Sequence, residues 1–166
     1  MSKDTFHDAG EARALRDAFG RFATGIAVIT ARDSEGPMGL TVNSFASVSL
    51  APPLLLFSVA RTCRSLDRLA AAASFAVNVL GRDQEAVSSR FSGRGGEKWT
   101  ADTRILEGSH GAPLIEGALA AFECRPFARH EAGDHVVFIG EVLRFETTGH
   151  GDPLLYYRGA YRALAI

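Results

Sequence analysis

The spacing of apolar and polar residues predicts one amphipathic helix near the N-terminus, followed by a chain made mostly of strands. In residues 11–23, apolar side chains recur every three or four positions with charged residues mostly between them, which is typical of a helix with one buried face. Gly25 is expected to end this helix. From Ile26 onward, β-branched residues in short runs separated by glycine and proline indicate strands.

The later elements are expected to be strands joined by two further helices. Strands 26–30 and 38–50 would form a hairpin around a turn at 34–37, and Pro52 ends the second strand because proline cannot donate to a ladder. Further strands are expected at 54–59, 75–80, 118–129, 135–147 and 154–164. Helices are expected at 62–73, with Thr62 as the N-cap, and at 83–91, before a glycine-rich loop at 92–103. Six or seven mostly antiparallel strands with about three helices predict a mainly β, Greek-key barrel.

The strand at 135–147 carries apolar side chains on both faces. Val137, Ile139, Leu143 and Phe145 share one face, and Val136, Phe138 and Val142 share the other. A barrel strand normally buries only its inner face, so the second apolar face predicts that a helix or a second subunit covers it. We therefore expect a homodimer.

Composition narrows the class of protein. The 166 residues suit a single domain spanning 1–166, and 18 basic against 19 acidic residues without a Lys/Arg run argue against a nucleic-acid partner. The N-terminus lacks an apolar signal segment and no stretch of about 20 apolar residues occurs, so a soluble protein is expected. Cys63 and Cys124 lie far apart without a CxxC motif, which favours a reducing cytoplasm over a disulfide scaffold.

Polar residues in the segment 41–49 do not alternate regularly, so the strand is expected to bend there. The polar members are Thr41, Asn43, Ser44, Ser47 and Ser49, and the residues between them are small or apolar. A flavin ring needs flat apolar walls with donors and acceptors along its pyrimidine edge, and small residues let backbone N–H groups reach that edge. A Ser/Thr-rich edge strand facing water is the alternative interpretation.

A second candidate is the start of the helix expected at 62–73. Thr62, Arg64 and Ser65 would bring two hydroxyl groups and a guanidinium to free backbone N–H groups, which suits a phosphate. An N-cap beside a solvated arginine explains the same residues without a ligand.

The third candidate is Gly133-Asp134-His135, at the junction of two strands. The acid could orient the imidazole for a ligand, or the tripeptide could be an ordinary hairpin turn. The nearby His130 lies five residues before His135, whereas the zinc motif HExxH needs a spacing of four on a helix. No metal site is predicted.

Several segments follow one another in an order that carries a resemblance through nearly the whole chain. They are FATGIAVIT at 22–30, GLTVNSFASVSLAPP at 39–53, the turn at 62–65, FAVNVL at 75–80, Arg90-Phe91 with Lys98-Trp99, Gly133-Asp134-His135 leading to 140–142, and YYRGAY at 156–161. In this order the chain resembles the short-chain flavin reductases, the FMN-binding split-barrel family that serves as the reductase component of two-component flavin monooxygenases.

The resemblance implies a homodimer of split β-barrels with the flavin ring near the subunit interface. The residues expected to line the ring and ribityl chain are Thr41, Val42, Asn43, Ser44, Ser47, Val48 and Ser49. The phosphate is assigned to Thr62, Arg64 and Ser65. The segment from Phe75 through Asn78 to Leu80 would supply backbone near the flavin tail, and Phe91 completes the flavin set. Gly133, Asp134 and His135 correspond to the GDH motif of the family, which is associated with nicotinamide binding.

The implied activity is that of an NAD(P)H:flavin oxidoreductase. Hydride would pass from a reduced nicotinamide, NADH or NADPH, to FMN or FAD, and the reduced flavin would supply a partner monooxygenase. No side chain need act as acid or base, so His135 is expected to position the nicotinamide. Two alternatives stay open: a flavin-binding carrier or sensor without nicotinamide turnover, and a flavoenzyme acting directly on an organic substrate.

Overall fold

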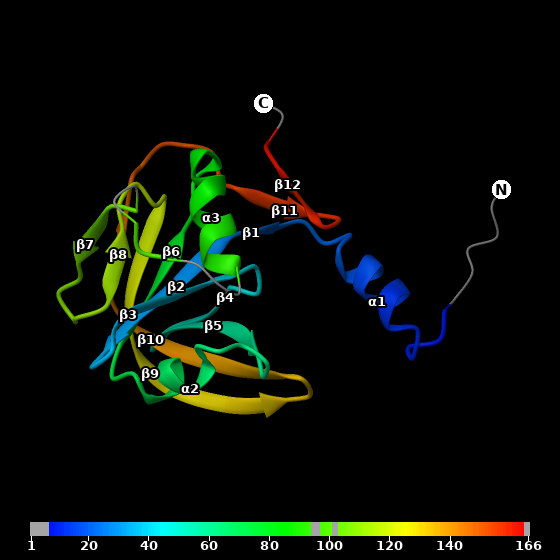
Figure 1. The fold of residues 1–166 in the computed structure, drawn as a ribbon, viewed down its shortest axis with the longest axis horizontal. Helices are drawn as coiled ribbons and strands as arrows, with labels where there is room; N and C mark the ends of the chain where they lie inside the picture. Colours follow the sequence, from blue (N-terminus) through cyan, green and yellow to red (C-terminus); the bar gives the residue numbers. More distant parts are fainter. Residues whose placement is uncertain (1–6, 94–96, 101–102, 165–166) are drawn as a thin grey trace.

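The computed structural model describes residues 7–93, 97–100 and 103–164, and its main body is a curved, seven-stranded antiparallel sheet (Figure 1). The strand order is β3-β2-β6-β9-β10-β5-β4. The bounds of these strands are β2 Ala27–Asp33, β3 Gly36–Val42, β4 Ala46–Leu50, β5 Pro53–Ala60, β6 Phe75–Val79, β9 Ala120–Ala132 and β10 His135–Thr147. The mainly β, antiparallel fold class expected from the sequence is confirmed.

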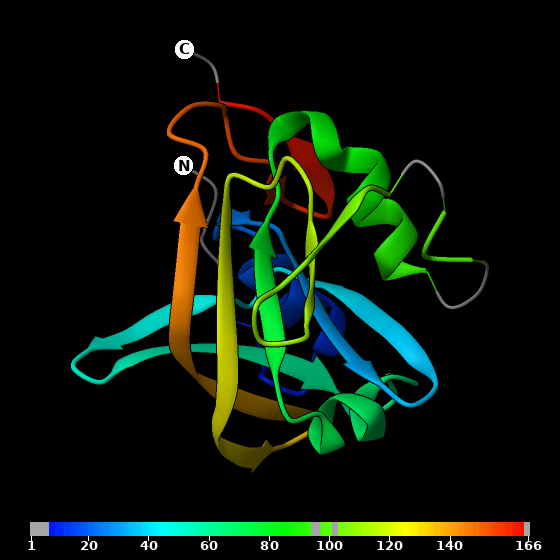
Figure 2. The same ribbon diagram turned by 90° about the vertical axis from the view of Figure 1, so that its left-hand side faces the viewer.

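The helices and short strands lie around this sheet. The helices are α1 Ala12–Phe19, α2 Leu66–Ala71, the 3-10 helix η1 Arg82–Gln84 and α3 Glu85–Ser92. A three-stranded sheet consists of β1 Thr24–Gly25, β11 Leu155–Tyr157 and β12 Ala160–Arg162, and a hairpin consists of β7 Ile105–Glu107 and β8 Pro113–Ile115. Figure 2 shows α3 beside the barrel and the β4–β5 hairpin extending out from it.

The expected single strand at 38–50 is wrong, because the chain breaks at residues 43–45 and its two halves form opposite ends of the sheet. At the break, the hydroxyl group of Ser44 makes the two hydrogen bonds that the backbone of a neighbouring strand would make. The amide N–H of Ser58 donates to Ser44 Oγ at 2.9 Å, and this hydroxyl donates to the Ser58 carbonyl at 3.1 Å. The sheet therefore curls into a barrel that is split between β3 and β4, and the bend expected in this segment is confirmed.

The barrel interior is filled with aromatic and branched side chains. Phe57 stacks in parallel on Phe138 with ring centroids 5.4 Å apart and meets the edge of Phe75 at 5.3 Å. Val136 and Phe138 are buried, as the inner face of β10 requires. A β-bulge after Val142 places Phe145 opposite Phe122, which packs against the core. The expectation that Phe145 shares a face with Val137 and Ile139 is therefore wrong. The ring of Phe145 stacks on Phe122 with centroids 6.2 Å apart and stays 66% exposed.

A second apolar cluster joins α3 to the barrel through Gly39. A Cβ atom at Gly39 would lie 2.5 Å from Cε1 of Phe91, so only glycine lets this ring lie against β3. Phe91 is fully buried and meets Trp99 edge to face with centroids 4.9 Å apart. The packing of α3 against β3 therefore depends on the absence of a side chain at Gly39.

Several expected elements differ from the structure at their ends. The helix expected at 11–23 ends at Phe19, because Gly20 already serves as its C-cap. The helix expected at 62–73 begins only at Leu66, so its N-cap is Ser65 and not Thr62. The strand expected at 154–164 is a hairpin, because Arg158 and Gly159 both take positive φ and turn the chain back. The β7–β8 hairpin was not expected at all.

The substitution Gly39→Ala tests the contact between β3 and α3. We expect a loss of about 1–3 kcal/mol in the free energy of unfolding, because the new methyl group displaces the buried Phe91 ring. Urea unfolding monitored by tryptophan fluorescence measures the loss. The control is Gly25→Ala, where a Cβ meets nothing within 4 Å; equal losses in the two variants would contradict this account.

Candidate functional site

A pocket of about 900 Å³ opens between the split end of the barrel and α3. Ligand pockets span roughly 300–1,000 Å³, so this one can hold two stacked ring systems. It is lined by residues 37–44, 58–60 and 62–65, by Arg68, by residues 91–93, and by Lys98, Trp99 and His135. The lining therefore combines the end of β3, the turn after β5, the end of α3 and the start of β10.

The β3 side of the pocket is an apolar wall with hydroxyl groups at its end. Met38, Leu40 and Val42 are buried beneath it. Thr41 Oγ1 donates to the Ser88 carbonyl at 2.7 Å, and Ser44 is held by the backbone of Ser58. Both hydroxyl groups donate their hydrogen to a carbonyl group of the protein, so toward a ligand they can act only as acceptors. The backbone of the strand supplies the other polar groups of this wall.

The charged side chains that line the pocket are basic. They are Arg64, Arg68 and Lys98, with His135 in addition, and no acidic residue lies among the described lining residues. Arg68 binds Asp33 through two hydrogen bonds of 2.7 and 2.5 Å, and the hydrogen bond from this guanidinium holds the pKa of Asp33 below its usual value. The pocket as a whole favours an anionic ligand.

Lys98 and Trp99 anchor their loop to β3. Lys98 Nζ donates to the carbonyls of Gly39 at 3.1 Å and Phe91 at 3.3 Å, and Trp99 Nε1 donates to the Pro37 carbonyl at 3.1 Å. Burial lowers the pKa of the Lys98 ammonium, and a smaller interaction with Cys63 opposes this shift. Lys98 and Trp99 therefore anchor this loop and also line the pocket.

The turn between β9 and β10 brings His135 to the pocket. Gly133 has a φ of 61°, which a glycine adopts without strain. Nδ1 of His135 lies 2.8 Å from Asp134 Oδ1, and this hydrogen bond lowers the pKa of Asp134. With Nδ1 held by the carboxylate, Nε2 is the ring atom left to meet a ligand.

Nine of the residues expected to bind cofactors line this pocket. They are Thr41, Val42, Asn43, Ser44, Thr62, Arg64, Ser65, Phe91 and His135. The structure thus brings the three segments singled out in the sequence to one cavity, although they are up to about ninety positions apart along the chain.

The other expected residues lie away from the pocket. Ser47, Val48 and Ser49 are on the edge strand β4, where Val48 is a bulge between the pairs Ser47↔Leu55 and Ser49↔Leu54. Gly133 and Asp134 lie behind His135 and form the turn itself. None of these five residues lines the pocket of the single chain.

Phe75, Asn78 and Leu80, expected to supply backbone near the flavin tail, lie in the core, and their side chains do not line the pocket. Each has an exposed fraction of 1% or less. Asn78 Nδ2 donates to the Val28 carbonyl and to Thr30 Oγ1 at 3.0 and 3.1 Å, and its Oδ1 accepts from the Ile115 amide at 2.9 Å. This amide joins β2, β6 and β8, and both of its N–H donors are used within the core.

Sequence reasoning missed Arg68 and Ser58 as pocket residues. Arg68 follows Arg64 by four positions, and this spacing in a predicted helix indicates a shared face. Ser58 sits in an apolar run, and a lone serine there carries no signal of its own. Its place in the pocket follows from the pairing of β5 with the broken strand.

Comparison with known proteins identifies the family. The flavin reductase like domain family matches residues 19–165. The chain belongs to this family. FMN reductase (NADH) SmoA of Agrobacterium fabrum is 45% identical over 161 residues, covering 96% of this chain and 91% of the relative. The reductase component of the flavin-dependent trigonelline monooxygenase of Acinetobacter baylyi is 43% identical, and the chain spans only 48% of its length.

Solved structures agree with this assignment. The NADH:FAD oxidoreductase SgcE6 of Streptomyces globisporus has a TM-score of 0.92 and 38% identity, with 97% of each chain covered. The same protein in complex with NAD and FAD fragments has a TM-score of 0.92 and 37% identity. Flavin reductase PheA2 has a TM-score of 0.87 and 38% identity and is covered in full.

The pocket of this flavin reductase domain fits a flavin by the chemistry of its lining. The apolar wall along β3 suits a flat ring, and the hydroxyl groups and cations at 62–68 suit a ribityl phosphate. In the ranges that the structure describes, no three His, Cys, Asp or Glu side chains come together to hold a metal ion. Nor do these ranges contain a helix long and apolar enough to cross a membrane.

Two asparagines of this flavin reductase domain separate structural from binding roles. Asn78→Ala should cost about 1–3 kcal/mol in the free energy of unfolding, because it leaves the buried Ile115 amide without an acceptor, while flavin affinity in the folded protein stays unchanged. Asn43→Ala, at the exposed pocket rim, should change stability by less than about 0.5 kcal/mol and weaken flavin binding. Chemical denaturation and flavin fluorescence titration measure both quantities; weaker flavin binding by the Asn78 variant would restore its cofactor role.

Proposed function

We propose that this chain, as one domain over residues 1–166, is an NADH:flavin oxidoreductase that delivers reduced flavin to a partner monooxygenase. The observation that carries the proposal is the pocket itself, in which the β3 wall, the cationic 62–68 segment and His135 face one cavity. A volume of about 900 Å³ suits a flavin together with a nicotinamide. A carrier without nicotinamide turnover would need only the first two of these features.

The protein contributes binding and orientation. A bound flavin supplies N5 as the atom that accepts hydride from C4 of the reduced nicotinamide, with two electrons moving and no bond to the protein. The β3 wall would hold one face of the flavin ring, Thr62, Arg64 and Ser65 would hold its phosphate, and His135 would hold the nicotinamide. Rate enhancement then comes from fixed geometry and exclusion of water from the stacked rings.

Relatives support NADH as the nicotinamide. SmoA is named for FMN and NADH, SgcE6 for NADH and FAD, and a Rhodococcus relative that is 36% identical is named NADH-dependent flavin reductase. Both FMN and FAD occur in these names, so the proposal includes either flavin. NADPH occurs in none of the three.

The partner is proposed to be a flavin-dependent monooxygenase. The trigonelline relative and HsaB of Rhodococcus jostii, which is 36% identical over 157 residues, are both named as reductase parts of such systems. We also infer a cytoplasmic location, where Cys63 and Cys124 stay as the free thiols found here.

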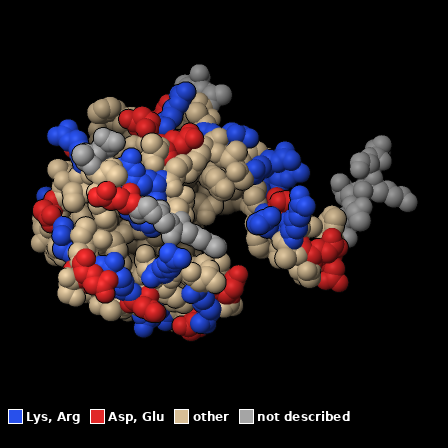
Figure 3. All heavy atoms as spheres, in the orientation of Figure 1, with Lys and Arg blue, Asp and Glu red and all other residues tan. Residues whose placement is uncertain are grey.

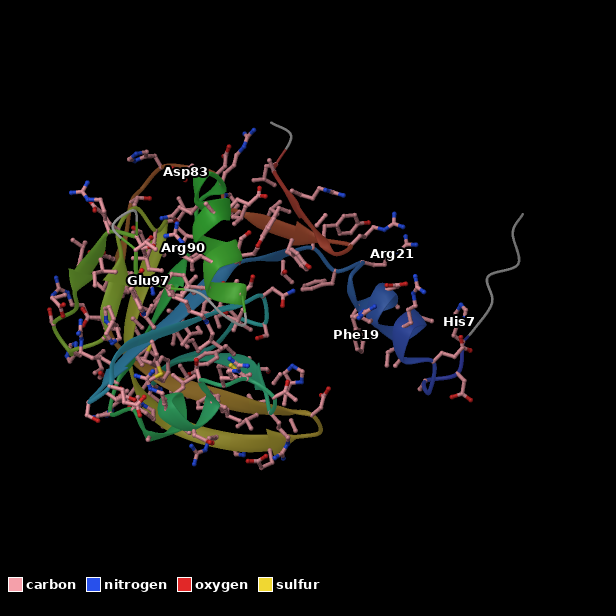
Figure 4. All side chains as sticks on the ribbon, in the orientation of Figure 1. His7, Phe19, Arg21, Asp83, Arg90 and Glu97 are labelled. Carbon is pink, nitrogen blue, oxygen red and sulfur yellow. The ribbon has the colours of Figure 1, made fainter. Side chains whose placement is uncertain are left out.

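The working form is proposed to be a homodimer, and α1 supplies the argument. This helix has no buried residue and stands away from the barrel, with Phe19 69% exposed (Figure 4). An eight-residue helix is not stable alone in water, so α1 needs a surface to pack on. The exposed side chains of Phe145, near the end of β10, and of Leu50, at the end of β4, offer such apolar surface on a second copy.

A crossed assay tests the activity. Purified protein with FMN or FAD should oxidise NADH, and His135→Ala should raise KM for NADH about tenfold with flavin affinity within about twofold, because only the nicotinamide loses a contact. Absorbance at 340 nm and flavin fluorescence titration measure the two quantities.

His150→Ala is the matched control, because this histidine bonds only within its own loop. An unchanged KM in the His135 variant would show that His135 does not position the nicotinamide. Wild-type protein that oxidises neither NADH nor NADPH with any flavin would end the proposal.

Phe19→Asp tests the dimer. The wild type should sediment as a dimer, and the variant should dissociate at least about tenfold more readily, because burying a phenylalanine contributes about 1.5–3 kcal/mol. The monomer should fold normally, since the ring is exposed in it. Leu106→Asp on β7 is the control, and a wild type that sediments as a monomer at micromolar concentration would rule the dimer out.

A further inference from the structure

The residue that follows β5, Arg61, makes three contacts to the turn that carries His135. Its backbone N–H donates to the Asp134 carbonyl at 2.9 Å, and its Nε donates to the Gly133 carbonyl at 2.9 Å. Its guanidinium also pairs with Glu131, on the strand that leads into the turn. Main chain and side chain of one residue thus hold the turn from the same side.

These contacts extend the β5–β10 ladder beyond its last regular pair. That pair is His135↔Ala60, and the next residue along β5 is Arg61. The side chain of Asp134 is 94% exposed, so the tip of the turn has little packing to restrain it. The restraint on the turn therefore comes from hydrogen bonds to its two carbonyl groups.

Arg61 can influence the pocket through its contacts with the turn at Gly133 and Asp134. Arg61 itself does not line the pocket, whereas His135 does. The Gly133 and Asp134 carbonyls set the backbone of the turn, the Asp134 carboxylate holds Nδ1 of His135 at 2.8 Å, and this sets the direction of Nε2. A change at Arg61 would alter the imidazole without removing any pocket atom.

Arg61 also precedes the segment assigned to the flavin phosphate. Thr62 is its neighbour in the chain, and Thr62, Arg64 and Ser65 all line the pocket. The turn that faces the nicotinamide is thereby tied to the turn that faces the flavin. An exposed ion pair alone adds little to folding stability, so the bond to the Gly133 carbonyl carries the larger consequence.

We propose that Arg61 is a positioning residue that holds the Gly133–His135 turn against the end of β5 and thereby orients His135 toward the nicotinamide. The inference rests on the proposed function for the identity of the ligand. The restraint on His135 stands on the contacts of this chain alone, so it can be tested without turnover.

The test compares Arg61→Ala and Arg61→Lys with the control Arg104→Ala. Arg104 makes an exposed 2.8 Å ion pair with Glu116 and does not line the pocket. Arg61→Ala should raise KM for NADH about tenfold, with kcat and flavin affinity within about twofold. Arg61→Lys, which keeps a donor and the charge, should recover part of this loss, and Arg104→Ala should match the wild type.

A second measurement uses the flavin-free protein. Histidine ¹⁵N NMR should show the Nδ1–H tautomer of His135 in the wild type and a mixture of tautomers in Arg61→Ala, with a thermal melt confirming that both are folded. Unchanged KM and tautomer in Arg61→Ala would overturn the inference. Equal losses of flavin and NADH affinity would overturn it too, because Arg61 would then act on the phosphate turn.

The two readouts separate this inference from the proposed function. A wild type without NADH oxidation would end the proposed function, while the tautomer comparison would still support or overturn the positioning role of Arg61.

Discussion

The architecture depends on the hydroxyl group of Ser44, which makes the hydrogen bonds that a peptide group of a neighbouring strand would otherwise make. The Ser44 hydroxyl bonds both the N–H and the carbonyl of Ser58. The backbone hydrogen bonds of β5 at this residue are therefore made without a neighbouring strand. This lets β3 and β4 leave each other and form the two ends of the sheet. The pocket lies beside this separation, between β3 and the end of β5. A closed ladder at this point would bury backbone that here faces the cavity.

The pocket has two kinds of lining, a wall formed by the strand β3 and a set of cationic side chains. Its wall is a strand buried from behind, fixed to α3 by Phe91 over Gly39. Its cations lie on different elements: Arg64 on the turn after β5, Arg68 on α2 and Lys98 on the loop after α3. Arg68 binds Asp33, and within the described ranges Lys98 donates to carbonyl groups. On the face shown in Figure 3, basic and acidic side chains are interspersed, in keeping with the net charge of −1. The cationic character therefore belongs to the pocket and not to the surface as a whole.

Periodicity in the sequence was enough for the fold class and for most strands, because β-branched runs bounded by glycine and proline are local signals. It failed where a distant partner decides the structure. The break after Val42 requires Ser58, fourteen positions from Ser44, and the β7–β8 strands have three residues each, too few for a period. Asn78 was placed near the flavin only through the family resemblance, as part of the segment from Phe75 to Leu80. Its hydrogen-bond partners Val28 and Ile115 are remote in sequence, so the sequence alone does not reveal its structural role.

Lys98 has a consequence for the thermodynamics of ligand binding. Its ammonium is partly buried with no carboxylate among the described lining residues, and its pKa is lowered by that burial. An anionic ligand entering the pocket would supply the missing counter-charge and shift this pKa back upward. Binding and protonation are then linked, so that the complex takes up protons in alkaline solution and affinity falls as pH rises through the lowered pKa. The same ammonium that fastens a loop to β3 thereby makes occupancy of the cavity sensitive to pH.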